Sequence, residues 1–192
     1  MVYPVIASNK QNSYLPLVNN DLYSKFVPSS SEREDCSAEN PRDNPDTSKP
    51  YYSETVELTV NRNTNGVICI PKNSTYYYEG AAYPGENVVS YCFDMISSVE
   101  IDSLDDIFVG TYRSFIVSYI ATDLETQFGN TFWNDSFKTS DESYEVMKFT
   151  ISEDSLILTW DAYILAAGAY GPITVELPLS SVTTYYKSGV NL

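Results

Sequence analysis

The sequence predicts an α+β fold, in which a twisted and mostly antiparallel sheet is covered by two main helices. Several segments alternate apolar and polar residues, as strands with one buried face do. Two longer segments repeat apolar residues at three- and four-residue steps, which is typical of amphipathic helices. With 192 residues, 43% of them hydrophobic, the chain is long enough for one well-buried domain or for two lobes that share a core.

We expect one continuous module with two lobes. The N-terminal lobe, 1–105, should contain a strand, a helix, an acidic loop at 29–50 and an antiparallel meander. The C-terminal lobe, 106–192, should contain a helix, a polar-aromatic segment and three strands. Both helices and most strands carry a single apolar face, which suits one covered sheet.

The first lobe begins with a strand-like entry, Val2–Ile6, and we therefore expect an excised or mature domain without its targeting segment. A helix from about Tyr14 to Phe26 follows, capped by Ser13. Its apolar stripe consists of Leu15, Val18, Leu22 and Phe26. The segment 29–50 has almost no apolar side chains, so it should be a solvated loop that is dispensable for folding.

The meander is expected to hold four strands between residues 52 and 95. A turn at Pro71–Ser74 should separate the second strand from the third, since proline and asparagine interrupt strands. The expected strands are Tyr52–Val60, Val67–Ile70, Thr75–Tyr83 and Val88–Met95.

The second lobe should begin with the main helix, from Tyr112 to Phe128, with Gly129 as its C-terminal stop. After the polar-aromatic segment 130–143, a hairpin is expected to place Phe149–Ile151 beside Leu156–Trp160. A third strand should cover Ile173–Leu177. The connection 161–170 is rich in apolar residues, so it should pack on the sheet or contact a partner.

Charge gives the strongest global indication of function. The net charge is −15 with a pI near 4.1, and no basic residue lies between Lys72 and Arg113, an interval with seven acidic residues: Glu79, Glu86, Asp94, Glu100, Asp102, Asp105 and Asp106. This disfavours binding to nucleic acid or to an anionic membrane surface, and it favours a cationic partner. No apolar run reaches the roughly 20 residues that span a bilayer, so we expect no membrane insertion by this segment.

The residue types present argue against metal and cofactor chemistry. Histidine is absent, which excludes Ser-His-Asp triads and histidine-based zinc sites. A calcium site at Asp102, Asp105 and Asp106 is a weaker alternative, because the spacing lacks the alternating ligands of an EF-hand. The three cysteines, Cys36, Cys69 and Cys92, fit either one disulfide with a thiol left over or buried free thiols.

We expect no catalysis, although carboxylates alone can hydrolyse glycans. The candidates would be Glu153 with Asp154, or Glu79 with Glu86. Adjacent acids in a hairpin turn are ordinarily solvated. A non-catalytic module is therefore the preferred interpretation, and a carboxylate-dependent glycan hydrolase is an alternative.

A family resemblance rests on two halves of the chain. The C-terminal half has the order F-x-I-x-E-D-x-L-x-L-x-W-x-x-Y-x-L-A-A-x-A-x-G-P-I-x-V-x-L-P over residues 149–178. The N-terminal half contributes Tyr76–Pro84, Tyr91–Asp94 and Ile101–Phe108. Together they resemble an extracytoplasmic bacterial module, the lysozyme-sensing outer domain of RsiV-type anti-sigma factors and the accessory domain of PdaC-type peptidoglycan deacetylases. Gly80–Tyr83 departs from the family's Gly-Gly-Ala-His, so any role of that histidine is lost or changed here.

The resemblance implies an extracytoplasmic recognition module of the bacterial cell envelope whose ligand is a protein. Lysozyme is the first candidate, and the charge of the chain separately favours a basic partner. We expect Glu79, Tyr83 and Glu86 to bind it, with carboxylates that steer the encounter. Tyr163 or Tyr170 would be apolar anchors. The alternative is a structural accessory domain of a peptidoglycan-modifying protein, with peptidoglycan as a further contact.

Overall fold

The alternating residues of the C-terminal half form a three-stranded antiparallel sheet, called sheet two below. The computed structural model describes residues 5–7, 12–26, 52–78, 80–129, 141–190 and 192. The strands of sheet two, in spatial order, are β6 (Lys148–Ile151), β7 (Ser155–Trp160) and β8 (Ile173–Pro178). Leu158 lies opposite both Phe149 and Val175, so these side chains share one face. The predicted hairpin and third strand are confirmed.

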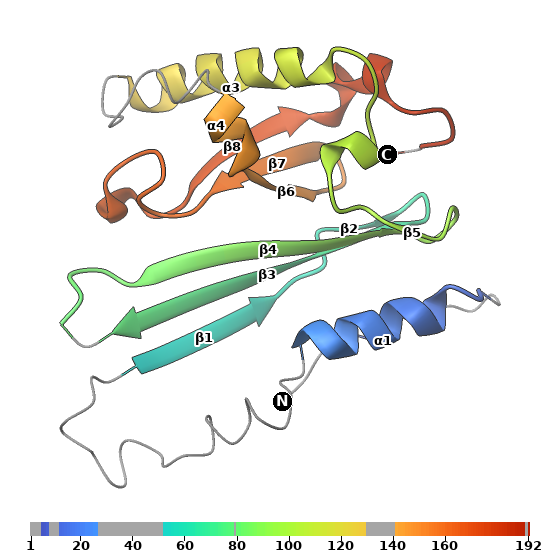
Figure 1. Ribbon diagram of the computed structural model, residues 1–192, viewed down its shortest axis with the longest axis horizontal. Coiled ribbons are helices and arrows are strands. Elements are labelled where there is room, and N and C mark those ends of the chain that lie inside the picture. The colour runs from blue at the N-terminus through green and yellow to red at the C-terminus, as the bar shows by residue number, and fades with distance from the viewer. Residues whose placement is uncertain (1–4, 8–11, 27–51, 79, 130–140, 191) are drawn as a thin grey trace, which may run out of the picture. The chain divides into compact units, whose positions relative to one another are not determined.

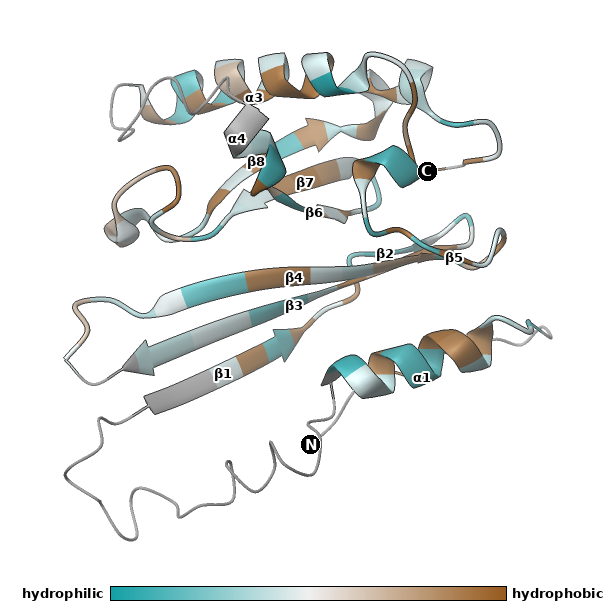
Figure 2. Cartoon of the chain, viewed as in Figure 1, coloured by the Kyte–Doolittle hydropathy of each residue, from teal (hydrophilic) through white to brown (hydrophobic). Residues whose placement is uncertain are grey.

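Helix α3 (Tyr112–Phe128) packs on sheet two through contacts with β8 (Figure 1). Ile116, Ile120 and Leu124 are at most 1% exposed, and brown apolar positions alternate with teal polar ones along the helix (Figure 2). Gly129 ends the helix with a φ of 56°, a left-handed conformation that glycine adopts readily. The main predicted helix and its stop are confirmed.

Sheet one is built from five strands of the N-terminal half. Its order is β1-β3-β4-β5, and β2 also pairs with β3. The β2–β3, β3–β4 and β4–β5 pairs are antiparallel, which agrees with the expected meander. The strands are β1 (Tyr52–Leu58), β2 (Arg62–Thr64), β3 (Val67–Tyr78), β4 (Gly85–Asp94) and β5 (Val99–Glu100).

The expected turn at Pro71–Ser74 is wrong, because β3 continues through it without interruption. Cys69 and Pro71 point their backbone carbonyls away from β4, toward the N–H groups of Asn61 and Thr59. The missing N–H of Pro71 therefore also faces this side, where the chain passes irregularly from β1 to β2. Proline is tolerated in a strand when the ladder loses no donor to its regular neighbour.

The chain divides into two compact units, residues 1–53 with 78–80, and residues 54–77 with 81–192. The first contains α1 (Leu15–Phe26), in which Val18 and Leu22 are buried as predicted. The Asn19 amide accepts a hydrogen bond from the Ile6 N–H and donates one to the Ile6 carbonyl, both at 2.8 Å. The packing of α1 on the sheet and the lobe boundary at residue 105 stay predictions.

Several expectations fall wholly or partly on residues outside the described ranges. They are the entry strand before Val5, the loop 29–50 with Cys36, and residues 130–140 of the polar-aromatic segment. The last residues of that segment begin α4 (Asp141–Glu145). The described residues 5–7 are not in a strand.

Short helical turns complete the larger unit. At η1 (Leu104–Asp106) the Ser103 N–H donates to Asp106 Oδ2 at 2.9 Å, as in a capping box at a helix start. The other turns are η3 (Gly168–Tyr170), η4 (Leu179–Ser181) and η5 (Thr183–Tyr185). Within the described ranges, no helix is long and apolar enough to cross a membrane.

The core of the larger unit joins α3, sheet two and one end of sheet one. Strands β4 and β6 contact each other, so the two sheets meet at these strands. Cys69 and Cys92 belong to the core and lie opposite each other in the β3–β4 register. They form a disulfide, which decides between the two alternatives that the sequence left open.

A buried arginine also connects the sheets. Arg62 in β2 is 2% exposed, and its Nη1 donates to the carbonyls of Ser152 and Glu153 at 2.7 and 3.0 Å. The Glu153 carboxylate in turn accepts hydrogen bonds from the Thr64 hydroxyl and the Asn63 N–H. These bonds fasten the β6–β7 turn to β2, and we call them the Arg62 clamp.

Candidate functional site

The tyrosines expected to contact a partner lie on two connections of the larger unit. Tyr83 is 52% exposed between β3 and β4, and Tyr163 and Tyr170 are 52% and 50% exposed between β7 and β8. Both connections lie at the left of the view in Figure 1. Glu79 lies outside the described residues. The exposure of the three rings leaves them available to a partner.

Glu86 lies in β4 opposite Thr75, and it is partly buried. It lines the same cavity as Pro172, which follows Tyr170 by two residues. The start of β4 and the end of the β7–β8 connection are therefore neighbours. Glu86 and the end of the segment that carries two of the predicted tyrosines thus line one cavity, although they are far apart in the sequence.

The β7–β8 connection is partly packed and partly exposed. Leu165 and Ala166 are 3% exposed and belong to the core, whereas Ile164 is 40% exposed. Tyr163 has a φ of 71°, which is unusual for a residue other than glycine. A methyl group added at Gly168 would lie 2.0 Å from the Tyr163 ring, so the ring covers this glycine. The expected docking of the connection on the sheet thus holds for its middle.

Tyr170 is positioned by the end of α3. Its ring meets Phe128 edge-on, with the two ring centroids 6.1 Å apart, an arrangement that aromatic pairs favour. The predicted anchors are therefore supported by different neighbours, Tyr163 by its own loop and Tyr170 by the helix.

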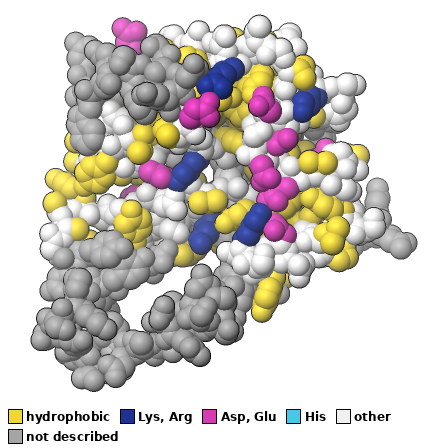
Figure 3. Space-filling view, viewed as in Figure 1, with side chains coloured by type: hydrophobic (Ala, Val, Ile, Leu, Met, Phe, Trp, Pro, Cys, Tyr) yellow, Lys and Arg dark blue, Asp and Glu magenta, His cyan; other side chains and the backbone are white. Residues whose placement is uncertain are grey.

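Figure 3 shows Asp and Glu side chains gathered on one face of the molecule, with Lys and Arg among them.

The cavity beside Glu86 lies where the inner faces of both sheets meet, and we call it the polar trough. Its volume is ≈ 500 Å³. Hydroxyl and amide side chains dominate its lining, together with the carboxylates of Glu57 and Glu86. These hydroxyl and amide residues are Thr59, Asn61, Asn73, Ser74, Thr75, Asn87, Thr150, Thr159 and Thr174.

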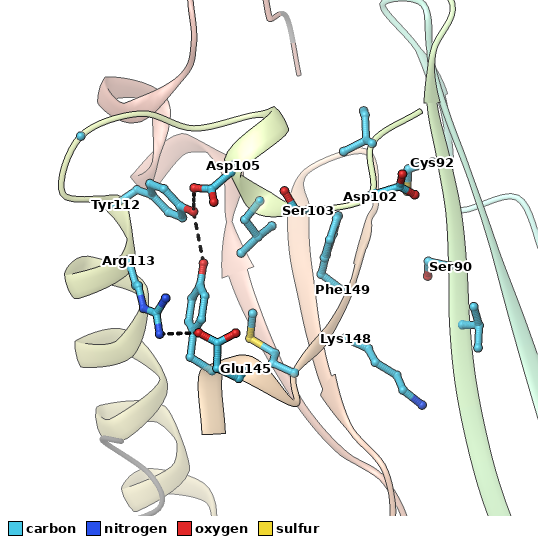
Figure 4. Close-up of a pocket in the computed structure, with 16 residues that line it drawn as sticks. Ser90, Cys92, Asp102, Ser103, Asp105, Tyr112, Arg113, Glu145, Lys148 and Phe149 are labelled. Atoms are coloured by element: carbon cyan, nitrogen blue, oxygen red, sulfur yellow. Dashed lines mark hydrogen bonds and ion pairs between the residues drawn. The ribbon is translucent and has the colours of Figure 1, made fainter. Parts of the chain in front are cut away.

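A second cavity, of ≈ 590 Å³, lies between β4, β6, η1 and the first turn of α3 (Figure 4), and we call it the tyrosine cavity. The Tyr112 hydroxyl donates to Asp105 Oδ1, and the Tyr144 hydroxyl donates to Tyr112 at 3.4 Å. Burial, followed by the hydrogen bond with Asp105, raises the pKa of Tyr112. Burial also raises the pKa of Tyr144. Both rings therefore stay neutral at physiological pH.

The cationic side chains of the tyrosine cavity already have acidic partners. Arg113 Nη2 lies 2.8 Å from Glu145 Oε1, and the guanidinium also covers the Tyr144 ring at 4.3 Å from its centroid. Lys148 Nζ lies 2.5 Å from Asp161 Oδ2. The positive charges are thus neutralised locally, and they do not offer an anion site.

Several of the carboxylates considered for calcium or for catalysis have structural contacts. Asp106 caps η1 and Asp105 accepts from Tyr112. Among the described residues, no group of three or more His, Cys, Asp or Glu side chains could hold a metal ion. Glu153 belongs to the Arg62 clamp through its hydrogen bonds with Thr64 and the Asn63 N–H. The bond from Thr64, followed by the one from the Asn63 N–H, lowers the pKa of Glu153.

Sequence reasoning did not find either cavity. Tyr112 and Tyr144 are 32 residues apart, and only the packing of α4 beside α3 brings their hydroxyls together. The trough has a partial signal, since threonine and asparagine recur at alternate positions of several strands. A polar strand face usually indicates solvent, so this signal alone does not indicate a cavity.

The fold and one segment of the chain have known relatives. Residues 105–180, which contain α3 and sheet two, match the family described as "Protein of unknown function (DUF3298)". No curated protein matches the chain. Two solved structures of DUF3298-family proteins are similar to this chain.

One is from Bacteroides fragilis NCTC 9343, with 18% identity over 91% of this chain and a TM-score of 0.53. The other is from Pseudomonas aeruginosa PAO1, with 17% identity over 90% of this chain and a TM-score of 0.55. The matches span 66% of the Bacteroides chain and 78% of the Pseudomonas chain. At this level of identity the likeness shows the fold alone.

Proposed function

We propose that this chain is a non-catalytic, extracytoplasmic recognition module of the cell envelope that binds a cationic protein, with lysozyme as the first candidate. The observation that carries the proposal is that Glu86 and the end of a connection with exposed aromatic rings line one cavity. Tyr163 and Tyr170 lie on the connection that reaches Glu86 through Pro172. Aromatic anchors with acidic neighbours suit an interface with a basic protein.

Two further features support this proposal. The net charge of −15 favours encounter with a cationic protein through long-range attraction. The Cys69–Cys92 disulfide is typical of proteins that work in an oxidising compartment, outside the cytosol. The likeness to RsiV-type sensors points to the same class of partner.

Titration calorimetry and binding kinetics with several lysozymes, at low and moderate salt, test the proposal. The on-rate should fall as salt rises, because screening shortens to about 8 Å at physiological ionic strength. Glu86→Lys should mainly lower the on-rate, and Tyr83→Ala should mainly raise the off-rate.

Matched controls lie elsewhere on the larger unit. Glu176→Lys reverses an exposed carboxylate on β8, and Ile96→Ala removes a side chain that is 75% exposed beyond the other end of β4. Glu176→Lys should lower the on-rate less than Glu86→Lys does, and Ile96→Ala should leave the off-rate unchanged. If no lysozyme binds at either salt concentration, the structural accessory module becomes the better interpretation.

A further inference from the structure

The polar trough lies on a surface of β3 and β4 that is apolar at one end and polar at the other. Side chains two residues apart in a strand share a face. In β3, Cys69 and Asn73 therefore share a face, as do their β4 partners Cys92 and Val88. At the disulfide this face belongs to the apolar core, and beyond Pro71 it lines the trough. The trough is thus a polar continuation of an inward-facing surface.

Sheet two supplies the other wall in the same way. Leu156, Leu158 and Val175 face the core under α3. The opposite face carries Thr150 beside Ile157 and Thr159 beside Thr174, and these two pairs line the trough. The trough is therefore built from residues of six strands, β1, β3, β4, β6, β7 and β8.

Some hydroxyls in this wall are withdrawn from solvent. Thr150 and Thr159 are only 5% and 6% exposed. The Thr150 Oγ1 atom is buried and has no hydrogen-bond partner among the described residues. A buried hydroxyl without a partner is costly, so its retention in a cavity points to a group that the cavity receives.

The lining restricts the chemistry of that group. Hydroxyl and amide side chains both donate and accept hydrogen bonds, so they match a ligand that does both at closely spaced positions. No Lys or Arg is among the described lining residues, whereas Glu57 and Glu86 are. An anionic ligand is disfavoured, and a neutral ligand or one with an amine is favoured. The volume of ≈ 500 Å³ lies in the range of small-ligand sites.

We propose that the polar trough is a saccharide-binding site that takes an uncharged or amine-bearing oligosaccharide. Sugar hydroxyls reach the threonine and asparagine side chains, one of them completing the hydrogen bonding of Thr150, and an amine lies near Glu57 or Glu86. The described lining has no aromatic ring, so recognition rests on hydrogen bonds rather than on stacking. This site shares Glu86 with the proposed protein recognition, but it takes a different class of ligand, and neither proposal requires the other.

The test is an NMR titration of the full ¹⁵N-labelled chain, without any protein partner, using four trisaccharides. They are the trimers of N-acetylglucosamine, glucosamine, glucose and galacturonate. We expect saturable shifts at the amides of Thr150, Thr159 and Thr174 with the neutral or amine-bearing trimers. The galacturonate trimer carries carboxylates and should cause none.

Two variants distinguish the trough from nonspecific contact. Thr150→Val keeps the shape of the side chain and should weaken binding by about 3- to 10-fold, the worth of one hydrogen bond. Glu86→Gln should weaken binding of the glucosamine trimer more than binding of the glucose trimer. Thr126→Val, on the exposed side of α3, is the matched control and should leave binding unchanged.

Three results would overturn the proposal. The first is the absence of saturable shifts with every trimer. The second is equal affinity of Thr150→Val and the unchanged chain. The third is that a hexapeptide of alternating Lys and Ser shifts the same amides and binds more tightly than every trisaccharide. That result would assign the trough to protein recognition. Lysozyme binding is measured separately, so failure of one proposal does not imply failure of the other.

Discussion

Sheet two buries one apolar face against α3, whereas sheet one adds a disulfide and a buried arginine to its apolar contacts. In sheet two, Leu158 and Val175 are fully buried in the same core as Ile116 and Ile120 of the helix. In sheet one, the Cys69–Cys92 bond and the Arg62 clamp connect strands whose inner face turns polar beyond Pro71. One sheet is stabilised by area removed from water. The other gains cross-links that leave part of its inner face free for polar residues.

The largest expected effect is on the helix that covers sheet two. Ile120→Ala should lower the free energy of unfolding by about 2–5 kcal/mol, because it opens a cavity in a core where this side chain is 1% exposed. Denaturant titration measures the change. Ile96→Ala, at a position 75% exposed, is the control and should change stability little. Equal midpoints for the two variants would contradict the core described here.

The disulfide is the next test, on the side of sheet one. Replacing both Cys69 and Cys92 by Ala should cost about 2–4 kcal/mol, since the bond closes a loop with a sequence separation of 23. Thermal unfolding compares the variant with the unchanged chain, and a reducing agent should destabilise only the latter. Cys36→Ala should leave this sensitivity to reduction intact. Loss of that sensitivity in Cys36→Ala would assign the bond to another pair.

The Arg62 clamp should contribute less than the disulfide. Arg62→Met keeps much of the buried volume but leaves the Ser152 and Glu153 carbonyls without this donor, which should cost about 1–3 kcal/mol. Arg113→Met removes a more exposed ion pair with Glu145, and it should cost at most about 1 kcal/mol. Chemical denaturation of both variants tests the order. A larger loss for Arg113→Met would mean that the clamp is not a main connection between the sheets.

A substitution in the trough should not lower the free energy of unfolding, in contrast to the three substitutions above. Thr150→Val replaces a buried hydroxyl without a partner by a methyl group, so the free energy of unfolding should rise by about 1 kcal/mol or stay unchanged. Thr126→Val is again the control on α3. A clear loss of stability in Thr150→Val would indicate that the hydroxyl has a structural partner.

The smallest expected effect is on the pH dependence of stability, through Glu153 at the β6–β7 turn. The pKa of Glu153 is lowered from its ordinary value of 4.5 in the folded chain, first by Thr64 and then by the Asn63 N–H. Its stabilising contribution is present above that ordinary value and is lost as pH falls through the lower folded pKa. Unfolding measured from pH 6 to pH 3 should therefore show a shallower loss of stability in Glu153→Gln. Parallel curves for the two proteins would show that this carboxylate adds nothing.

Sequence periodicity predicted the parts of the fold whose side chains alternate by polarity. The β6–β7 hairpin and α3 both follow one apolar face, so their existence and approximate bounds could be predicted. Pro71 misled the prediction in sheet one. A proline ends a strand only when its missing N–H faces a regular neighbour, and that direction depends on the register with β4.

The candidate sites were predictable only in part. The sequence nominated Tyr83, Tyr163 and Tyr170 as partner contacts, and these rings are exposed in the structure. Their binding of a partner stays a prediction. The trough could not be predicted, because it forms where six strands from two sheets meet and each strand contributes only a few polar residues. A single strand with that pattern is equally compatible with a solvent-facing surface.

The contact between Tyr163 and Gly168 has a consequence for the cost of association. A loop that must become ordered on binding loses conformational entropy, and this loss weakens the complex. Here the ring already rests on Gly168, and the next two residues after Ile164 are anchored in the core. Little freedom remains to be lost at this ring when a partner arrives. A side chain added at residue 168 would displace the ring, and it would restore that entropic penalty without removing any residue of the proposed interface.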